Sequence, residues 1–487
     1  MKKKSVFLAV LAMSVLAMFA KLPYSHSQEV PASVRRTVNY NIPRYSSDPS
    51  MFLLGFFAYH PSVFTFVNSD GSVAVCVSDD NAKMTHIYEY TADLAEQRTF
   101  TFRNELDVLG AFTKDSDGNY YFFYGKEAVS KTDNNMAMVK YDRNGNRVRT
   151  FMLAAGAPNS YEGIQNPFQS STCRLEISGN MLAVYFGRRM FPSSDGFRHQ
   201  SSYGFVLNKD TFARVDLGAA YNSKLSGDMR IPYVSHSFNQ FILPVRDGFV
   251  FVDHGDGAPR AFSFAKFQNG KNTDRLNGFR FPGEDGSNAT YSEMGGLAKT
   301  SNGYIFAFTY APEDNYPLNL FIHTFDDNLQ TFTTPVFYTN YTEKNEYLHV
   351  GHPKIIGLDS GKYLLMWEVF TYIGRTGHVS THLLIIDERG SRLSEIMRVQ
   401  ARLSMIDVPR YNSRNKKVYW AVNDSPNSIV TYALDIGKLS ASAVRPLPAA
   451  ALQLPAHAVP PPIAPLTPPA PAEPAEPRTI IKPTKTK

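Results

Sequence analysis

Short runs of apolar residues recur along the middle of the chain, and each run follows a tight polar turn. The seven segments are SDGSVAVCVS at 69–78, SDGNYYFFYG at 116–125, SGNMLAVYFG at 178–187, RDGFVFVDHG at 246–255, SNGYIFAFTY at 301–310, SGKYLLMWEV at 360–369 and RNKKVYWAVND at 414–424. Glycine marks six of these turns, 47 to 69 residues apart, and Asn415 stands at the seventh. Asp-Gly and Asn-Gly between apolar runs favour tight hairpins. The pattern therefore predicts a β-hairpin in every unit.

A third apolar strand follows in each unit, and a fourth follows in six of them. The fourth strands are RTFTF, RVRTFML, ARVDL, GFRFP, PVFY and SEIMRV. The seventh unit lacks a good fourth strand before the proline-rich tail, and the N-terminal segment RRTVNYNIPRY at 35–45 is expected to supply it. Repeated units of four antiparallel strands predict an all-β fold, a seven-bladed β-propeller in which an N-terminal strand closes the last blade. Six or eight blades are the alternatives.

The two ends of the chain differ from this repeat. Residues 1–27 combine a basic start with an apolar run from Val6 to Ala20, the pattern of a secretory signal peptide. From residue 440 the chain becomes rich in proline and alanine, with 13 of its 31 prolines between 446 and 483. Such a segment cannot bury a core and is expected to be a disordered tail. The repeat itself then occupies residues 28–439.

The net charge of the predicted repeat limits the classes of partner that it can bind. The net charge is +6, but four lysines lie in the leader and the tail carries a net +3, which leaves the body near −1. A nucleic-acid partner needs a basic footprint, so none is expected. No second long apolar run exists, so no transmembrane segment is expected after cleavage. The chain is expected to be exported, to the periplasm, the cell surface or the medium, as a monomer or as part of an envelope assembly.

Cys76 and Cys173 are the chain's two cysteines. One pair does not make the disulfide framework of a small secreted domain. Both lie in strand-like segments of separate units, so buried free thiols are expected.

Loop length distinguishes the two faces of the predicted ring. The turns between first and second strands and between third and fourth strands are short, which predicts one smooth face. The longer loops then emerge together on the other face, where binding residues tend to gather. Ten polar residues are expected at this loop-rich mouth: Arg188, His199, Gln200, His236, Asp253, His254, Asp256, Arg260, Glu293 and His352.

The chain resembles a loose group of uncharacterised secreted bacterial repeat proteins. The resemblance rests on SHSFNQ at 235–240, on DHGDGAPRAF at 253–262 and on HPKIIGLDSGKYLLMWE at 352–368, and it covers about 170–370. It implies a propeller fold and export, and it implies no chemistry.

Three functions remain open from these residues. A rigid disc with a loop-rich face favours a binding or scaffolding module for a protein or glycan at the cell envelope. The histidines, carboxylates and arginines also fit a polysaccharide-active hydrolase or lyase, although no catalytic residue can be named. A purely structural envelope role is the third. No cofactor is predicted; a divalent metal on His236, His254 and Asp256 is the alternative.

Overall fold

The structure is a computed structural model. It describes residues 28–38, 58, 60–156, 162–169, 171–215, 234–257, 260–272, 276–287, 290–311, 317–341, 348–371, 377–425 and 427–439. The chain divides into a compact unit Met1–Pro448 and a second unit Ala449–Lys487. The expected leader (1–27) and the expected tail (440–487) both lie outside the described residues.

The regular secondary structure of the described residues is almost all β-strand, arranged in six hydrogen-bonded sheets. Four sheets have four strands: β3 (Val63–Val67), β4 (Val73–Asp79), β5 (Met84–Tyr90), β6 (Glu96–Arg103); β7 (Val108–Lys114), β8 (Tyr120–Gly125), β9 (Asn134–Tyr141), β10 (Arg147–Ala154); β20 (Ser292–Lys299), β21 (Gly303–Tyr310), β22 (Asn319–Asp326), β23 (Val336–Phe337); and β28 (Arg410–Asn412), β29 (Lys417–Ser425), β30 (Ser428–Asp435) with β2 (Ser33–Val38). A five-stranded sheet holds β24 (Leu348–Gly357), β25 (Lys362–Thr371), β26 (Gly377–Asp387), β27 (Met397–Val399) and β1 (Glu29–Val30). A short helix, α2 (Ile436–Leu439), follows β30.

The largest sheet has nine strands and consists of two repeats. Its strands are β11 (Asn166–Pro167), β12 (Cys173–Ser178), β13 (Met181–Arg189), β14 (Gln200–Asn208), β15 (Ser235–Val245), β16 (Gly248–Gly257), β17 (Arg260–Gln268), β18 (Lys271–Asn272) and β19 (Leu276–Arg280). Backbone strand pairing between the two halves is limited to a single residue pair, Ser201 with Ser235. Each half otherwise has the antiparallel order of the other repeats.

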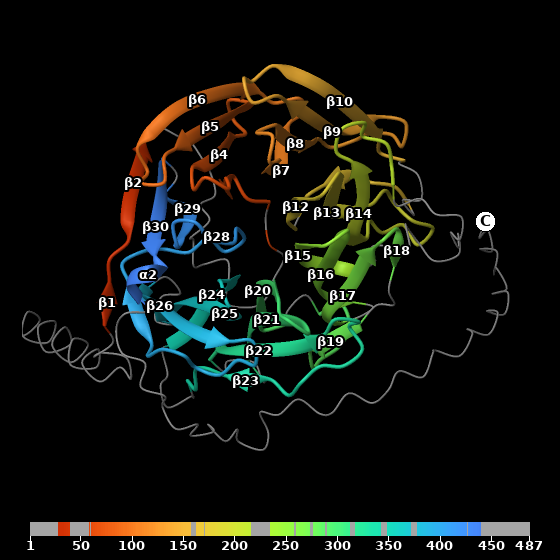
Figure 1. Cartoon of the computed structure of the whole chain (residues 1–487). Helices are drawn as coiled ribbons and strands as arrows, with labels where there is room; N and C mark the ends of the chain where they lie inside the picture. Colours follow the sequence, from red (N-terminus) through yellow and green to blue (C-terminus); the bar gives the residue numbers. More distant parts are fainter. Residues whose placement is uncertain are drawn as a thin grey trace, which may run out of the picture. The chain divides into compact units, whose positions relative to one another are not determined.

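The sheets are arranged around a common centre (Figure 1). Their first strands contact one another in the order β3, β7, β12, β15, β20, β24, β28, and β28 contacts β3 again. Antiparallel sheets placed radially in this way form the architecture of a β-propeller. Each first strand consequently faces the axis.

The N-terminal segment pairs with the last strands of the chain. β2 runs antiparallel to β30 from Ser33 with Ala433 to Val38 with Ser428. β1 runs parallel to β27 through two residue pairs. Residues 39–45 of the expected closing strand lie outside the described residues. The observed pairing covers the outer edge of the β28–β30 sheet, an edge that would otherwise be open to association.

Tight turns require glycine for two different reasons. Gly118 has φ of +87°, a conformation that other L-residues rarely adopt. At Gly303 the limit is space, since a Cβ there would lie 1.8 Å from the carbonyl oxygen of Phe325. These constraints fix the hairpin register and therefore which side chains reach the axis.

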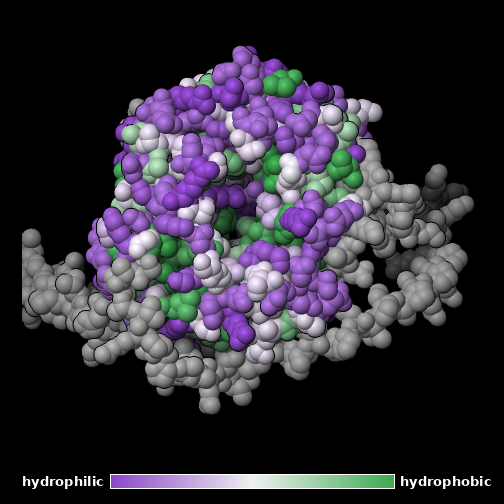
Figure 2. All heavy atoms as spheres, in the orientation of Figure 1, coloured by the Kyte–Doolittle hydropathy of each residue, from purple (hydrophilic) through white to green (hydrophobic). Residues whose placement is uncertain are grey.

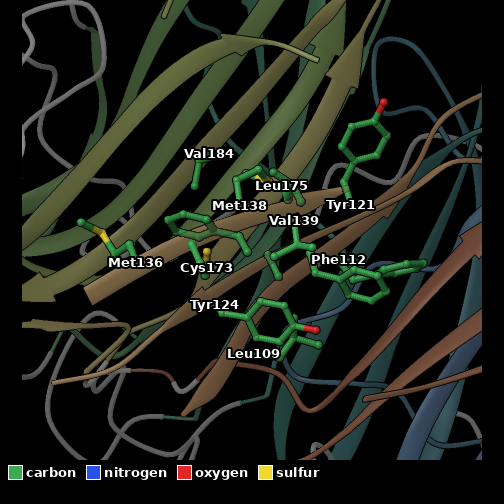
Figure 3. Close-up of a cluster of buried hydrophobic side chains, with 14 of the residues drawn as sticks. Leu109, Phe112, Tyr121, Tyr124, Met136, Met138, Val139, Cys173, Leu175 and Val184 are labelled. Atoms are coloured by element: carbon green, nitrogen blue, oxygen red, sulfur yellow. The ribbon is translucent and has the colours of Figure 1, made fainter. Parts of the chain in front are cut away.

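The core lies between neighbouring sheets. Figure 3 shows one such layer, in which Leu109 and Tyr124 approach Cys173 and Leu175 from the next repeat. Cys173 and Cys76 are both buried and free, as expected, and burial raises the pKa of each thiol well above its usual range. Neither thiol is therefore a reactive thiolate.

Candidate functional site

His236, Asp256 and Arg260 form one charged cluster on β15 to β17. The buried Asp256 carboxylate lies 3.1 Å from Nδ1 of His236 through one oxygen and 3.5 Å from Nη1 of Arg260 through the other. The His236 side chain stays 31% exposed. Its hydrogen bond with Asp256 raises the pKa of the imidazole, more than burial lowers it. The cluster therefore holds a partly exposed imidazole next to a buried carboxylate. This contact favours the protonated form of the imidazole.

The local backbone explains how His236 reaches this position. Its φ is 50°, and the register of β15 against β16 shifts between Ser237 and Asn239. His352 on β24 has φ of 53° and lies within a register shift, between Gly351 and Lys354. Bulges redirect side chains and are common beside functional sites. The first strands of two repeats thus use the same device to aim a histidine.

His254 does not join the charged cluster. Its ring packs 5.1 Å from Phe238, 4.8 Å from Phe262 and 5.2 Å from Phe281. Its Nε2 lies 2.7 Å from the hydroxyl of Thr290, and burial lowers the pKa of the imidazole to about 3. A neutral histidine in an aromatic layer is a packing residue.

Asp253 and Gln200 lie in a buried hydrogen-bond network. Both Asp253 oxygens accept from Ser237 Oγ, at 2.8 and 2.9 Å, and one accepts from Tyr185 Oη at 2.7 Å. The Gln200 amide donates to the carbonyl of Ser237 at 2.6 Å and accepts from its N–H. These contacts tie the two halves of the nine-stranded sheet together.

Arg188 and His199 lie apart from the cluster. Arg188 is fully buried and donates to the carbonyl of Gly163 at 3.0 Å and to Ser201 Oγ at 3.1 Å. His199 is 38% exposed, and its Nε2 lies 2.9 Å from an Asp195 oxygen in the same loop. The structure thus brings together His236, Asp256 and Arg260, and gives the other five expected residues of this region partners outside the cluster.

Glu293 and His352 belong to a second polar group, on β20, β24 and β25. The His352 backbone N–H donates to Glu293 Oε2 at 2.7 Å, and its Nδ1 lies 2.7 Å from Glu368 Oε2. Burial raises the pKa of Glu293 to about 8. Burial opposes ionisation of Glu368 as well, but His352 and Arg402 nevertheless lower its pKa to about 2. Two carboxyl groups beside one histidine therefore hold opposite protonation states at neutral pH.

Charged residues also cross the central axis. Arg410 on β28 donates to Glu176 on β12 at 2.6 Å, although these strands are not neighbours in the ring. A cavity of about 30 Å³ lies beside this pair, lined in part by Arg174 and Asp407. Lys354 is buried and donates to the carbonyl of Met405 at 2.9 Å, and burial lowers its pKa to about 7. Glu176, Lys354 and Arg410 are not among the expected site residues, because a charge within a strand is more often exposed.

No group of three or more His, Cys, Asp or Glu side chains in the described residues could hold a metal ion. The proposed ligand His254 is instead surrounded by phenylalanines. No helix in the same residues has the length and hydropathy of a membrane span. The face shown in Figure 2 is hollowed near its centre, with hydrophilic residues over much of the surrounding surface.

Comparisons with known proteins add no family. No family model matches the chain, and no curated protein matches it in sequence. Among solved structures, an ulvan lyase is 9% identical with a TM-score of 0.40, over 67% of this chain and 78% of its own. The β-propeller domain of the Trilobed protease from Pyrococcus furiosus is 12% identical with a TM-score of 0.38, over 77% and 94%. A subtype N10 neuraminidase-like protein of A/little yellow-shouldered bat/Guatemala/060/2010 is 8% identical with a TM-score of 0.37, over 68% of this chain and 93% of its own. With scores this low these likenesses carry no argument about activity.

Proposed function

We propose that this chain is an exported binding module that recognises a glycan or protein ligand at the cell envelope through the His236–Asp256–Arg260 cluster. The observation that supports the proposal is the partly exposed imidazole of His236, held in place by the buried Asp256. A raised pKa favours the imidazolium, which attracts an anionic group such as a uronate or an acidic side chain. The bulged strand fixes its direction before the ligand arrives.

The test compares two histidines, each paired with one aspartate. His236→Ala should weaken binding to acidic oligosaccharides and envelope protein fractions about tenfold, the loss expected for a charge-assisted hydrogen bond. His199→Ala is the matched control, since His199 also pairs with an aspartate but lies in an exposed loop. Binding should be stronger at pH 6 than at pH 8. Equal affinities for the two variants would contradict the proposal.

The proposal includes a seven-bladed ring closed by the N-terminal strand. Support comes from the cyclic contact order of the seven first strands and from the pairing of β2 with β30. Deleting residues 28–45 should lower the melting temperature far more than deleting residues 446–487. Equal losses of melting temperature in the two deletions would contradict closure of the ring by the N-terminal strand.

Export and a solvated tail also remain proposals. They rest on the apolar leader and on the proline content beyond residue 440. Limited proteolysis should remove the tail rapidly and leave a resistant core that starts after residue 27. A tail that survives digestion would contradict this part of the proposal.

A second candidate function is cleavage of a glycan by acid–base chemistry at Glu293. The supporting observation is the buried Glu293 Oε1, which has no hydrogen-bond partner among the described residues. A carboxyl group with a pKa near 8 can donate a proton at neutral pH, while the ionised Glu368 beyond His352 cannot. Glu293→Gln should abolish any release of reducing ends from acidic polysaccharides. Undiminished release in this variant would remove Glu293 from the chemistry.

A further inference from the structure

A groove lies where the β3–β6 sheet meets the β7–β10 sheet, on the face formed by the tight turns. Its volume is about 670 Å³, within the roughly 300–1,000 Å³ of small-ligand sites. The turn at 68–72 between β3 and β4 forms one wall, and the turn at 115–118 between β7 and β8 forms the other. The short turns predicted a smooth face, and at this junction the face is hollow.

The floor of the groove is a buried, ordered set of charges. Glu89 on β5 accepts from Lys114 Nζ at 2.7 Å, from Tyr120 Oη at 2.6 Å and from Arg98 Nε at 2.5 Å. Glu89 and Lys114 are both nearly inaccessible to solvent. Burial would raise the pKa of Glu89, but the three donors outweigh it and lower the pKa. The floor is therefore fixed before any ligand binds.

The groove exists because the link between these two sheets is recessed. At three other junctions the turns, or the strand ends beside them, are in contact: Asn412 Nδ2 donates to the carbonyl of Asn68 at 2.9 Å, Tyr363 Oη donates to the carbonyl of Lys299 at 2.8 Å, and Lys416 pairs with Asp359 at 2.5 Å. Between the β3–β4 turn and the β7–β8 turn, no hydrogen bond or ion pair is present among the described residues. The Lys114–Glu89 pair joins the sheets below, which leaves the space above it open.

The rim offers unpaired polar groups of three kinds. The side chains of Gln97, Asp117 and Arg143 line the groove and make no hydrogen bond to the described residues. They supply an amide, a carboxylate and a guanidinium, which together can donate to and accept from hydroxyl groups. Phe66, which is half-buried, adds an apolar surface.

The charge of the lining argues against an ionic ligand. Four carboxylates and three cations line the groove, and the most buried of them neutralise one another. An anion or a cation would therefore meet little net field. A neutral ligand rich in hydroxyl groups, with an apolar ring face, matches both the unpaired rim groups and the balance of charge.

We infer that this groove is a binding site for a short neutral oligosaccharide, separate from the His236 cluster on the loop-rich side. The ligand hydroxyls bond to Gln97, Asp117 and Arg143, and a sugar ring lies over Phe66. The inference goes beyond the proposed function, because it needs neither His236 nor an anionic ligand.

The test is calorimetric titration of the full chain with maltotriose, cellotriose, xylotriose and chitotriose. At least one should bind, and Arg143→Ala should weaken that binding about tenfold, as expected for a lost charge-assisted hydrogen bond. Arg389→Ala is the matched control, because Arg389 is exposed in the equivalent turn between β26 and β27. Ser116→Trp, at an exposed turn position, should block the groove while leaving the melting temperature unchanged.

Three results would overturn the inference: no binding of any of the four trisaccharides, unchanged binding in Ser116→Trp, or tighter binding of trigalacturonate than of every neutral trisaccharide. His236→Ala should leave trisaccharide binding unchanged. Failure at the groove can therefore be distinguished from failure of the proposed function.

Discussion

Two junctions between neighbouring repeats use polar residues in opposite ways. Between β12 and β15, Ser171 Oγ and Thr172 Oγ1 donate to Gln240 Oε1 at 2.9 and 2.8 Å, and the Gln240 amide in turn reaches Ser237. All four side chains are buried, and we call this contact between repeats the sealed junction. Between the β3–β6 and β7–β10 sheets, which meet at what we call the open junction, the polar link lies deeper and a groove of about 670 Å³ remains above it.

The difference shows what a cluster of polar residues in a sequence means. The SHSFNQ segment carries five polar residues in six, and Ser237, Asn239 and Gln240 each form a hydrogen bond with a residue of the preceding repeat. The turn SDGN at 116–119 resembles any hairpin turn, yet it borders an open groove. A polar side chain is available to a ligand only where its neighbours do not already satisfy it.

The largest expected effect is at the sealed junction. Asp253→Ala removes the acceptor for Ser237 and Tyr185 in a fully buried network, which should lower the free energy of unfolding by about 4 kcal/mol. Asp117→Ala, at the open junction, should change it by less than about 0.5 kcal/mol. Urea denaturation measures both. Similar losses in the two variants would break the comparison.

A smaller effect on stability is expected at the Lys114–Glu89 pair in the floor of the groove. Glu89→Gln keeps an acceptor for Lys114 but loses the charge, at a cost of about 2 kcal/mol at pH 7. Because the pKa of Glu89 is lowered in the folded state, its ionisation stabilises the protein above the unfolded pKa of 4.5. That contribution is lost as pH falls through the folded pKa.

Unfolding curves between pH 3 and pH 7 would show this as a steeper acid loss in the original chain than in Glu89→Gln. Arg98→Gln, which removes a partly exposed partner, should show an intermediate slope. Parallel curves for the original chain and Glu89→Gln would contradict the assigned role of the floor.

A smaller effect than at Glu89 is expected at His236, at the exposed end of the sealed junction. Its pKa is raised by Asp256, so its protonation stabilises the fold fully below the unfolded value of 6.5 and is lost as pH rises through the folded pKa. His236→Ala should therefore cost less than about 1 kcal/mol, mostly at acidic pH. A loss larger at pH 8 than at pH 5.5 would contradict this assignment.

Much of the fold could be predicted from the sequence, because Gly118 and the other turn residues impose tight hairpins between apolar strands. The all-β repeat, the free cysteines and the contribution of an N-terminal strand follow from local pattern. The arrangement of the site could not be predicted in this way. His254 and Asp256 are two residues apart in one strand, yet one packs among phenylalanines and the other binds His236.

The groove depends on contacts between repeats, which no local pattern encodes. Whether two turns touch is decided by contacts between residues that are far apart in the chain, such as Lys114 with Glu89, 25 residues apart, and Asn412 with Asn68, 344 residues apart. Unpaired rim residues such as Arg143 carry no distinguishing signal in the sequence. Only the folded structure shows which of these side chains lack a hydrogen-bond partner.

The most direct test of this account is hydrogen–deuterium exchange of the full chain with and without a saturating neutral trisaccharide. The account predicts slower exchange in the turns at 68–72, 115–119 and 142–146, and no change in 235–240 at the sealed junction. Slower exchange in 235–240, with no change at the three turns, would contradict the claim that the open junction is the binding site.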